Sequence, residues 1–286
     1  MENTNILKAI SNLVKNPISA LGEIRSLSSN RANSMGEALE IYVKDIFCGT
    51  LGEENNAKKD LEYGKLFSYL GNQNNPPDIM IKGGDAIEVK KHLGNRVADL
   101  ALNSSYPKDI LLADSPMITS ECRNCEVWDK KDIIYAIGNI VDQNISSIWF
   151  VYGDCYAASK DIYERIRNKI SQGIAELPDI ELAETVELGR VNRVDPLGVT
   201  ALRVRGMWTI NHPSRVFSYV ENIVAGGLFN VNTVMLKTKY DSFSDVDRNE
   251  IESIQSDKFK INDIKIKSPN NPAVLLDAKL ITYKID

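Results

Sequence analysis

The sequence predicts an α/β protein with a central mixed β-sheet flanked by helices. Apolar residues recur at helical spacing in some segments and alternate or run continuously in others, and the two kinds of segment are interleaved along the chain. No long linker rich in Gly, Ser or Pro separates them. The 286 residues, of which 43% are hydrophobic, are enough for one substantial core. A single domain over residues 1–286 is therefore expected.

The first elements are expected to be helices. Residues 1–30 have apolar positions at helical spacing before and after Pro17, which predicts a helical N-terminal arm. A sharper start signal follows, because Ser34 and Glu37 have the spacing of a capping box. Apolar residues at helical spacing come next, so a helix is predicted over residues 35–47.

The remaining elements are predicted from their apolar pattern. Residues 49–75 are polar and rich in asparagine, which predicts a loop. Two helices are predicted where isoleucines recur close to every fourth residue, over residues 132–140 and 161–174. Strands are predicted on either side of Gly83-Gly84 and in the later segments that alternate or run apolar, over residues 147–152, 199–210, 233–238 and 274–285.

Composition excludes several classes of protein. The apolar runs are far shorter than the roughly 20 residues of a membrane span, and no secretion signal precedes the first helix. Four cysteines are too few for a disulfide scaffold, so a cytoplasmic protein is expected. Cys122 and Cys125 form one Cys-x-x-Cys pair, which lacks the further ligands that structural zinc needs. The net charge of −5 argues against nonspecific polyanion binding but is compatible with a local basic cleft.

The predicted hairpin around the glycine pair carries the informative acids. A three-residue loop over residues 82–84, with a glycine in the left-handed conformation, places Asp78 directly opposite Glu88. A two-residue loop would put these acids on opposite sides of the sheet. The three-residue loop sorts the side chains better, because it gathers the apolar ones on one face and both acids with Lys90 on the other. Only Asp85 departs from the apolar face.

Two acids in this register favour a metal site. Cross-strand neighbours have Cβ atoms about 4.5–5.5 Å apart, so two carboxylates there repel each other unless a cation lies between them. Oxygen ligands suit Mg²⁺ better than zinc. Lys90 lies on the same face as Glu88 and can orient a water or help to deprotonate it. The pattern predicts metal-assisted phosphodiester hydrolysis.

These residues match a known signature. Pro77-Asp78, nine intervening residues and Glu88-Val89-Lys90 resemble the PD-(D/E)XK nuclease motif. The wider sequence resembles type II restriction endonucleases of the NgoPII type, in segments that cover residues 33–40, 78–91, 135–139 and 202–208. The resemblance implies the PD-(D/E)XK fold, in which Asp78 and Glu88 hold Mg²⁺ and Lys90 assists the attacking water. It also implies a homodimer that cuts double-stranded DNA at a short palindrome such as GGCC, with a cognate DNA methyltransferase protecting the host.

Two further residues are expected to support this centre. In this nuclease fold a helix before the hairpin often adds a glutamate to the metal site. Glu37 already serves the capping box, whereas Glu40 lies at the edge of the buried helix face and has no such local role. Glu40 is therefore expected to complete the catalytic set, against the alternative of a solvated flank. Lys91 is expected to contact phosphate, against the alternative of a solvated charge.

DNA contacts are expected from the segment around residues 185–240. Between residues 188 and 219, five arginines stand against the single acid Asp195, a net charge of +4. The arginines are Arg190, Arg193, Arg203, Arg205 and Arg215. Arg203 and Arg205 are expected on one face of a strand, with Leu202, Val204 and Met207 packing elsewhere. Arginine is the preferred bidentate partner of guanine, which suits a G·C-rich site. The alternative is a salt-bridged outer strand.

The residues themselves leave other functions open. A repair or recombination nuclease of the same fold would cut by DNA structure or damage, and would leave a smear where a restriction enzyme leaves discrete fragments. A noncatalytic DNA-binding protein would bind without cleavage in Mg²⁺. A protein unrelated to nucleic acid would show no salt-dependent DNA binding.

Overall fold

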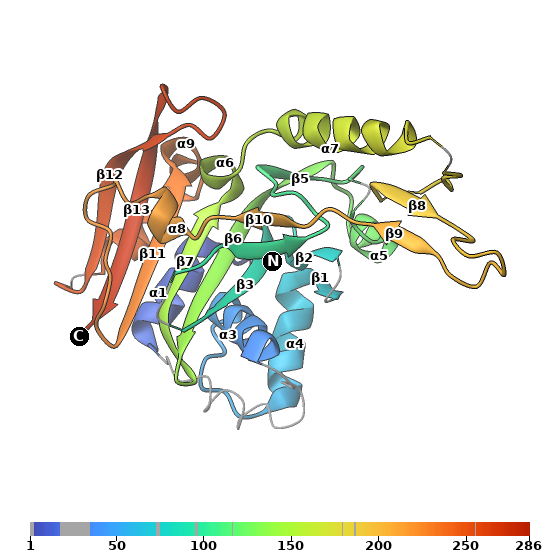
Figure 1. Cartoon of the computed structure of the whole chain (residues 1–286). Coiled ribbons are helices and arrows are strands. Elements are labelled where there is room, and N and C mark those ends of the chain that lie inside the picture. The colour runs from blue at the N-terminus through green and yellow to red at the C-terminus, as the bar shows by residue number, and fades with distance from the viewer. Residues whose placement is uncertain are drawn as a thin grey trace.

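A computed structural model describes residues 3–17, 35–72, 75–94, 97–115, 117–178, 180–185, 187–254 and 256–286. Its centre is a mixed sheet of nine strands in the order β1-β2-β3-β6-β7-β11-β13-β12, with β5 pairing on β6 (Figure 1). The β3–β6 and β7–β11 pairs are parallel and the others are antiparallel. The strands are β1 (Phe67–Asn72), β2 (Asn75–Ile81), β3 (Ala86–Leu93), β5 (Ile110–Leu112), β6 (Lys130–Val141), β7 (Asn144–Tyr152), β11 (Phe229–Leu236), β12 (Phe259–Lys267) and β13 (Leu275–Ile285).

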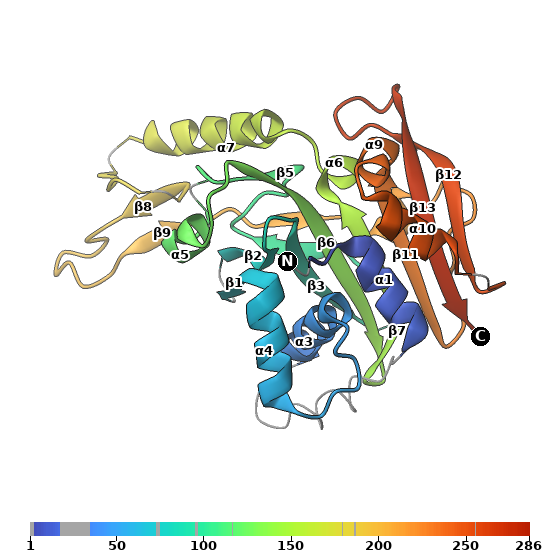
Figure 2. The ribbon, with the colours of Figure 1, turned by 180° about the vertical axis from the view of Figure 1, so that it is seen from behind.

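Two small sheets and several helices surround the central sheet. One small sheet pairs β4 (Leu100–Asn103) with β10 (Trp208–Ile210), and the other pairs β8 (Gly189–Val191) with β9 (Leu202–Val204). The helices are α1 (Ile6–Lys15), α3 (Met35–Cys48), α4 (Asn56–Leu66), α5 (Ser120–Asn124), α6 (Gly153–Tyr156), α7 (Lys160–Ala175), α8 (Pro213–Val216), α9 (Lys237–Asp241) and α10 (Asp245–Glu252). Figure 2 shows α1 and α3 against one face of the sheet. No helix in the described ranges is long and apolar enough to cross a bilayer.

Several predicted elements are confirmed. The α/β class with a central mixed sheet is observed, and α1, α3, α7, β7, β11 and β13 lie where the apolar pattern predicts them. Asn5 caps α1 by accepting hydrogen bonds from the backbone of Leu7 and Lys8, and the apolar face of that helix is fully buried. The helix expected after Pro17, and the capping role of Ser34, fall on residues 18–34, outside the described residues.

Three predicted elements are wrong. Residues 132–140 form part of strand β6 and not a helix, because a strand between two neighbours is buried on both faces and therefore runs apolar without alternation. Residues 49–75 contain α4 and β1 where a loop was expected, and α4 buries few apolar side chains, so its pattern is weak. The strand expected over residues 199–210 is two short strands, β9 and β10, in different sheets.

Helix α3 packs very closely on the sheet beside β3. The Leu39 side chain lies over Gly138 of β6, where a Cβ atom would come within 2.5 Å of Leu39 Cδ1. Gly138 is the partner of Lys91 in the parallel β3–β6 ladder. The missing side chain therefore lets α3 approach the strand that carries Glu88 and Lys90.

Candidate active site

The hairpin has the register that the sequence predicts. Ile79 pairs with Ile87 and Met80 with Ala86, so continuing the ladder by one residue puts Asp78 opposite Glu88. The turn is residues 82–84: the Ile81 amide donates to the Asp85 carbonyl at 3.0 Å, and Gly83 has a φ of +61°. Asp78 and Glu88 therefore share one face of the sheet.

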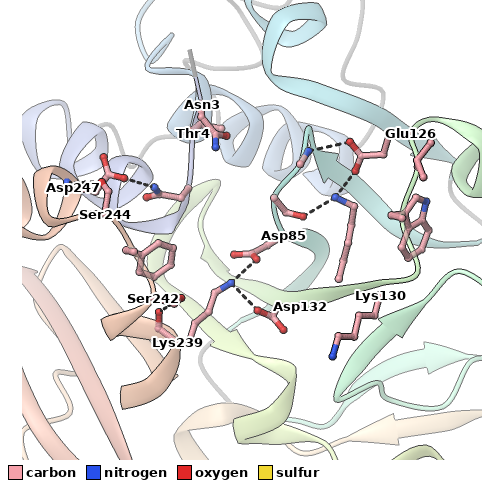
Figure 3. A pocket seen from close by; sticks show the side chains of 17 residues that line it. Asn3, Thr4, Asp85, Glu126, Lys130, Asp132, Lys239, Ser242, Ser244 and Asp247 are labelled. Atoms are coloured by element: carbon pink, nitrogen blue, oxygen red, sulfur yellow. Dashed lines mark hydrogen bonds and ion pairs between the residues drawn. The ribbon is translucent and has the colours of Figure 1, made fainter. Parts of the chain in front are cut away.

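Asp85, the polar residue on the apolar face, anchors the turn. Its carboxylate accepts from Tyr152 Oη at 2.6 Å and from Lys239 Nζ at 2.7 Å, and Lys239 also reaches Asp132, as Figure 3 shows. Glu126 accepts from the Gly83 amide at 2.9 Å on the other side of the turn. These contacts line a pocket of about 670 Å³ at the turn, the opposite end of the hairpin from the Asp78–Glu88 pair. Tyr152 and Lys239, which bind the Asp85 carboxylate, both come from outside the hairpin, so the local pattern could not reveal them.

The acids opposite each other are held by local hydrogen bonds. Asp78 Oδ2 accepts from the Val89 amide at 2.6 Å, which ties β2 to β3 beyond the paired residues. Lys90 Nζ donates to Glu88 Oε1 at 2.6 Å. The second oxygen, Glu88 Oε2, is buried and has no hydrogen-bond partner within the described part of the chain. A buried acceptor of this kind is costly unless a cation or donor completes it.

The electrostatic field of the site couples these groups. Burial raises the pKa of Asp78 well above its usual value, and the Glu88 carboxylate raises it further, while Lys90 opposes the shift. Burial lowers the pKa of Lys90, but Glu88, Asp78 and Glu40 outweigh it, so the pKa lies above its usual value. Lys90 is therefore a protonated ammonium at neutral pH. The site holds more carboxylates than cations and favours an added positive charge.

Glu40 lies in the same electrostatic field. Burial raises the pKa of Glu40; Lys44 and Lys90 lower it, while Glu37 and Glu88 raise it. Glu40 belongs to α3, the helix that Gly138 allows to approach β3. The structure thus brings together the four residues that the sequence singles out: Glu40, Asp78, Glu88 and Lys90. Within the described ranges, no group of three or more His, Cys, Asp or Glu side chains is arranged to hold a metal ion.

Lys108 is a neighbour of the site that sequence reasoning missed. It is 6% exposed, and its ammonium donates to Ser105 Oγ and to the Tyr106 carbonyl. Burial lowers the pKa of Lys108 to about 8, and Glu88 and Lys90 also act on it. Its backbone is fixed by Tyr135, the partner of Glu88 on β6. Lys108 lies in the loop between β4 and β5, and the sequence around it has no pattern that points to the neighbouring site.

Arg190, Arg193, Arg203 and Arg205 lie on or beside a separate ribbon formed by β8 and β9, which projects from the body of the molecule (Figure 1). Arg215 lies apart from them in α8, where it binds Asp99 and the Val97 carbonyl. All four predicted contacts, Arg190, Arg193, Arg203 and Arg205, are exposed, as is Lys91 on β3. Arg203 and Arg205 both bind Glu187, an acid just outside the segment counted from the sequence. Leu202 and Met207 are 52% and 73% exposed, so the expectation that they pack is wrong. The short ribbon has too little neighbouring structure to bury them.

Comparison with known proteins assigns the class. The NgoPII restriction endonuclease family model matches residues 4–267. The chain is also 48% identical over 283 residues to the type II restriction enzyme NgoPII of Neisseria gonorrhoeae, covering 98% of this chain and 100% of that protein. No solved structure matches the chain significantly. The protein is a type II restriction enzyme, a site-specific deoxyribonuclease. It belongs to the NgoPII restriction endonuclease family.

Proposed function

We propose that this restriction enzyme has the PD-(D/E)XK fold and cuts DNA by Mg²⁺-dependent phosphodiester hydrolysis at the Asp78–Glu88 pair. The observation that carries the proposal is the cross-strand register of these two acids, with Lys90 bound to Glu88 and no hydrogen-bond partner among the described residues for the second Glu88 oxygen. The family assignment indicates that DNA is the substrate, and the hairpin residues are the ones that we propose perform the hydrolysis.

Asp78 and Glu88 would hold the Mg²⁺. The site fits this ion, because both ligands are carboxylates on one face and one buried Glu88 oxygen has no partner in the part of the chain that the structure describes. When bound there, Mg²⁺ would supply Lewis-acid polarisation of the scissile phosphate and a water of lowered pKa. Glu40 completes the set from α3 by adding negative charge beside Lys90.

Lys90 is the residue that acts on the water. Glu88 fixes its ammonium at 2.6 Å, so the remaining N–H donors are aimed from a constrained position. These donors orient the attacking water and stabilise the negative charge that develops on the phosphate. Because Lys90 stays protonated at neutral pH, its ammonium acts as a hydrogen-bond donor and a positive charge and not as a base.

The DNA is contacted by the ribbon and by β3. Arg190, Arg193, Arg203 and Arg205 are exposed cations on the projecting ribbon within residues 185–240, and Lys91 follows directly after the site. Phosphate contacts from such residues set the position of the duplex, and arginine reads guanine in the major groove. The target is a short G·C-rich palindrome such as GGCC.

A homodimer follows from the symmetry of a palindromic target, since each protomer cuts one strand. The functional counterpart is a cognate DNA methyltransferase that protects the host DNA. All four cysteines are free thiols, which suits the reducing cytoplasm where such a system works.

The test is digestion of unmethylated phage DNA by the purified protein in Mg²⁺. Wild-type protein is expected to give discrete fragments, and Lys90→Ala or EDTA to leave the DNA intact. Lys82→Ala is the matched control, because Lys82 is exposed on the same hairpin and its ammonium donates to the Gly64 carbonyl, away from the Asp78–Glu88 pair. Cleavage by Lys90→Ala at the wild-type rate would refute the catalytic role, and a smear would contradict site-specific cutting by this centre.

A further inference from the structure

One carboxylate on the ribbon binds two arginines at once. Arg203 donates to Glu187 through Nε at 2.9 Å and through Nη2 at 2.6 Å, and Arg205 donates through its Nε to the same oxygen, Glu187 Oε1. The Glu187 side chain is 13% exposed, whereas each arginine side chain is 53% exposed. Glu187 thus lies beneath two guanidinium groups that face solvent.

The bonds leave the outer edge of each guanidinium available. A guanidinium has five N–H donors, and the Nε side is the edge that Glu187 occupies. The Nη1–Nη2 edge of Arg203 keeps one N–H on each nitrogen in parallel, and both Nη groups of Arg205 are unused by Glu187. That edge has the spacing that binds O6 and N7 of guanine.

Without the carboxylate, the arginines would repel one another. Arg190 is the direct cross-strand partner of Arg203, and Arg203 and Arg205 are two residues apart on the same face. Like charges directly opposite each other destabilise a strand pair. Behind this face the ribbon is supported by α7, where Ser171 Oγ donates to the Leu188 carbonyl at 3.0 Å and Ile174 packs against Gly189. Because α7 supports the backbone of the ribbon, we attribute the directions of the Arg203 and Arg205 side chains to their bonds with Glu187.

We propose that Glu187 is a positioning residue for sequence recognition, which fixes Arg203 and Arg205 by their Nε edges and so aims their outer edges at guanine in the major groove. This inference rests on the proposed DNA contact of the ribbon. It differs from a repulsive role, in which Glu187 would only weaken binding of the DNA polyanion, and from a structural role, in which it would only stabilise the ribbon.

The three roles predict different effects of Glu187→Gln on DNA binding, on discrimination between sites and on stability. Removing one negative charge from this surface is expected to strengthen nonspecific DNA binding, whichever of the two acids is changed. Loss of orientation instead lowers the discrimination between the cognate site and a site with one altered G·C pair. The matched control is Glu184→Gln, because Glu184 is an exposed acid three residues earlier and its loss changes the net charge equally.

The experiment measures single-turnover cleavage rates on the duplex site mapped from the digest and on duplexes with single base-pair changes, and nonspecific binding against salt concentration. Glu187→Gln is expected to lose about tenfold to a hundredfold in discrimination, with nonspecific binding as strong as that of Glu184→Gln or stronger. Melting temperatures of the two variants are expected to agree within about 2 °C, because exposed ion pairs contribute little stability.

Discrimination of Glu187→Gln equal to that of Glu184→Gln would overturn the inference. A parallel fall in melting temperature, nonspecific binding and discrimination would also overturn it in favour of a structural role. Arg203→Ala separates this failure from that of the proposed DNA contact. If Arg203→Ala leaves discrimination and binding unchanged, the ribbon does not read DNA. If Arg203→Ala loses discrimination and Glu187→Gln does not, only the positioning role fails.

Discussion

At the scale of single residues, the hairpin holds two aspartates whose environments are opposite. Asp85 is paired with Lys239 and Tyr152, whereas Asp78 faces Glu88 across the strands and has the Val89 amide as its hydrogen-bond donor. The folded protein raises the pKa of Asp78, so this group contributes stability that is present below its unfolded pKa and is lost as pH rises through the folded value. The ionised site therefore destabilises the metal-free protein at neutral pH.

Asp78→Asn is expected to stabilise the metal-free protein while abolishing cleavage. The amide keeps an acceptor for Val89, removes the repulsion with Glu88 and can donate to its unpartnered oxygen. Melting in EDTA near pH 7.5 is expected to rise by roughly 2–4 °C, the shift that about 1 kcal/mol produces in a chain of this size. Below about pH 4 the difference is expected to vanish, because the wild-type carboxyl is protonated in both states.

Asp85→Asn is the matched control on the same hairpin. It removes a charge that Lys239 and Tyr152 require, so it is expected to destabilise the protein by roughly 1–3 kcal/mol. A lower melting temperature for both variants would show that Asp78 is an ordinary structural acid.

At the scale of elements, the position of α3 determines whether Glu40 reaches the site. A side chain at Gly138 would collide with Leu39, so Gly138→Val is expected to displace α3 from β3. We expect a loss of stability of about 1–3 kcal/mol and a slower cleavage rate. The measurement is thermal melting together with the single-turnover rate, and Gly64→Ala in α4, where a Cβ atom meets nothing within 4 Å, is the control.

A double variant separates the collision from other effects of Gly138→Val. Adding Leu39→Ala removes the side chain that the valine strikes, so the two changes are expected to be less damaging together than the sum of their separate effects. Strict additivity would contradict the close-packing account.

The sequence predicts the hairpin well, where a clear apolar face fixes the register, and misassigns β6 and α4, whose patterns are ambiguous or weak. The Asp78–Glu88 register follows from parity because the hairpin has a clear apolar face. Strand β6 was mistaken for a helix because its isoleucines are buried on both faces. Helix α4 was missed because a polar cluster of Lys59, Tyr63 and Asp45 holds it, at 2.5 Å for each Asp45 bond. Glu187 was missed because a charge count within one segment cannot identify ion-pair partners across a turn.

At the scale of the whole molecule, a buried histidine pair joins distant segments. His92 lies near the end of β3 and His212 caps α8, and their ring centroids lie 5.6 Å apart. Burial lowers the pKa of His212 to about 4, with His92 and Arg215 adding to the effect. A depressed histidine pKa contributes stability that is present above the unfolded pKa, near 6.5, and is lost as pH falls toward the folded value.

The wild-type protein is therefore expected to lose stability between about pH 6.5 and pH 4, by on the order of 3 kcal/mol from this residue. His212→Asn keeps a side-chain cap for α8 but cannot titrate, so its stability is expected to fall less steeply over the same window. Denaturant unfolding at several pH values in that range measures the slope. Equal slopes for both proteins would assign the acid sensitivity to other groups.

The most direct test of the nuclease centre is the single-turnover cleavage rate as a function of Mg²⁺ concentration, for the wild type, Glu88→Gln and Lys90→Ala. We expect Lys90→Ala to lower the saturating rate by about 10²–10⁴-fold with a midpoint that is unchanged or lower, because it removes the water-directing ammonium and leaves the carboxylates. We expect Glu88→Gln to raise the Mg²⁺ midpoint at least about tenfold. The same rate and midpoint for all three proteins would contradict the assignment of catalysis to this hairpin.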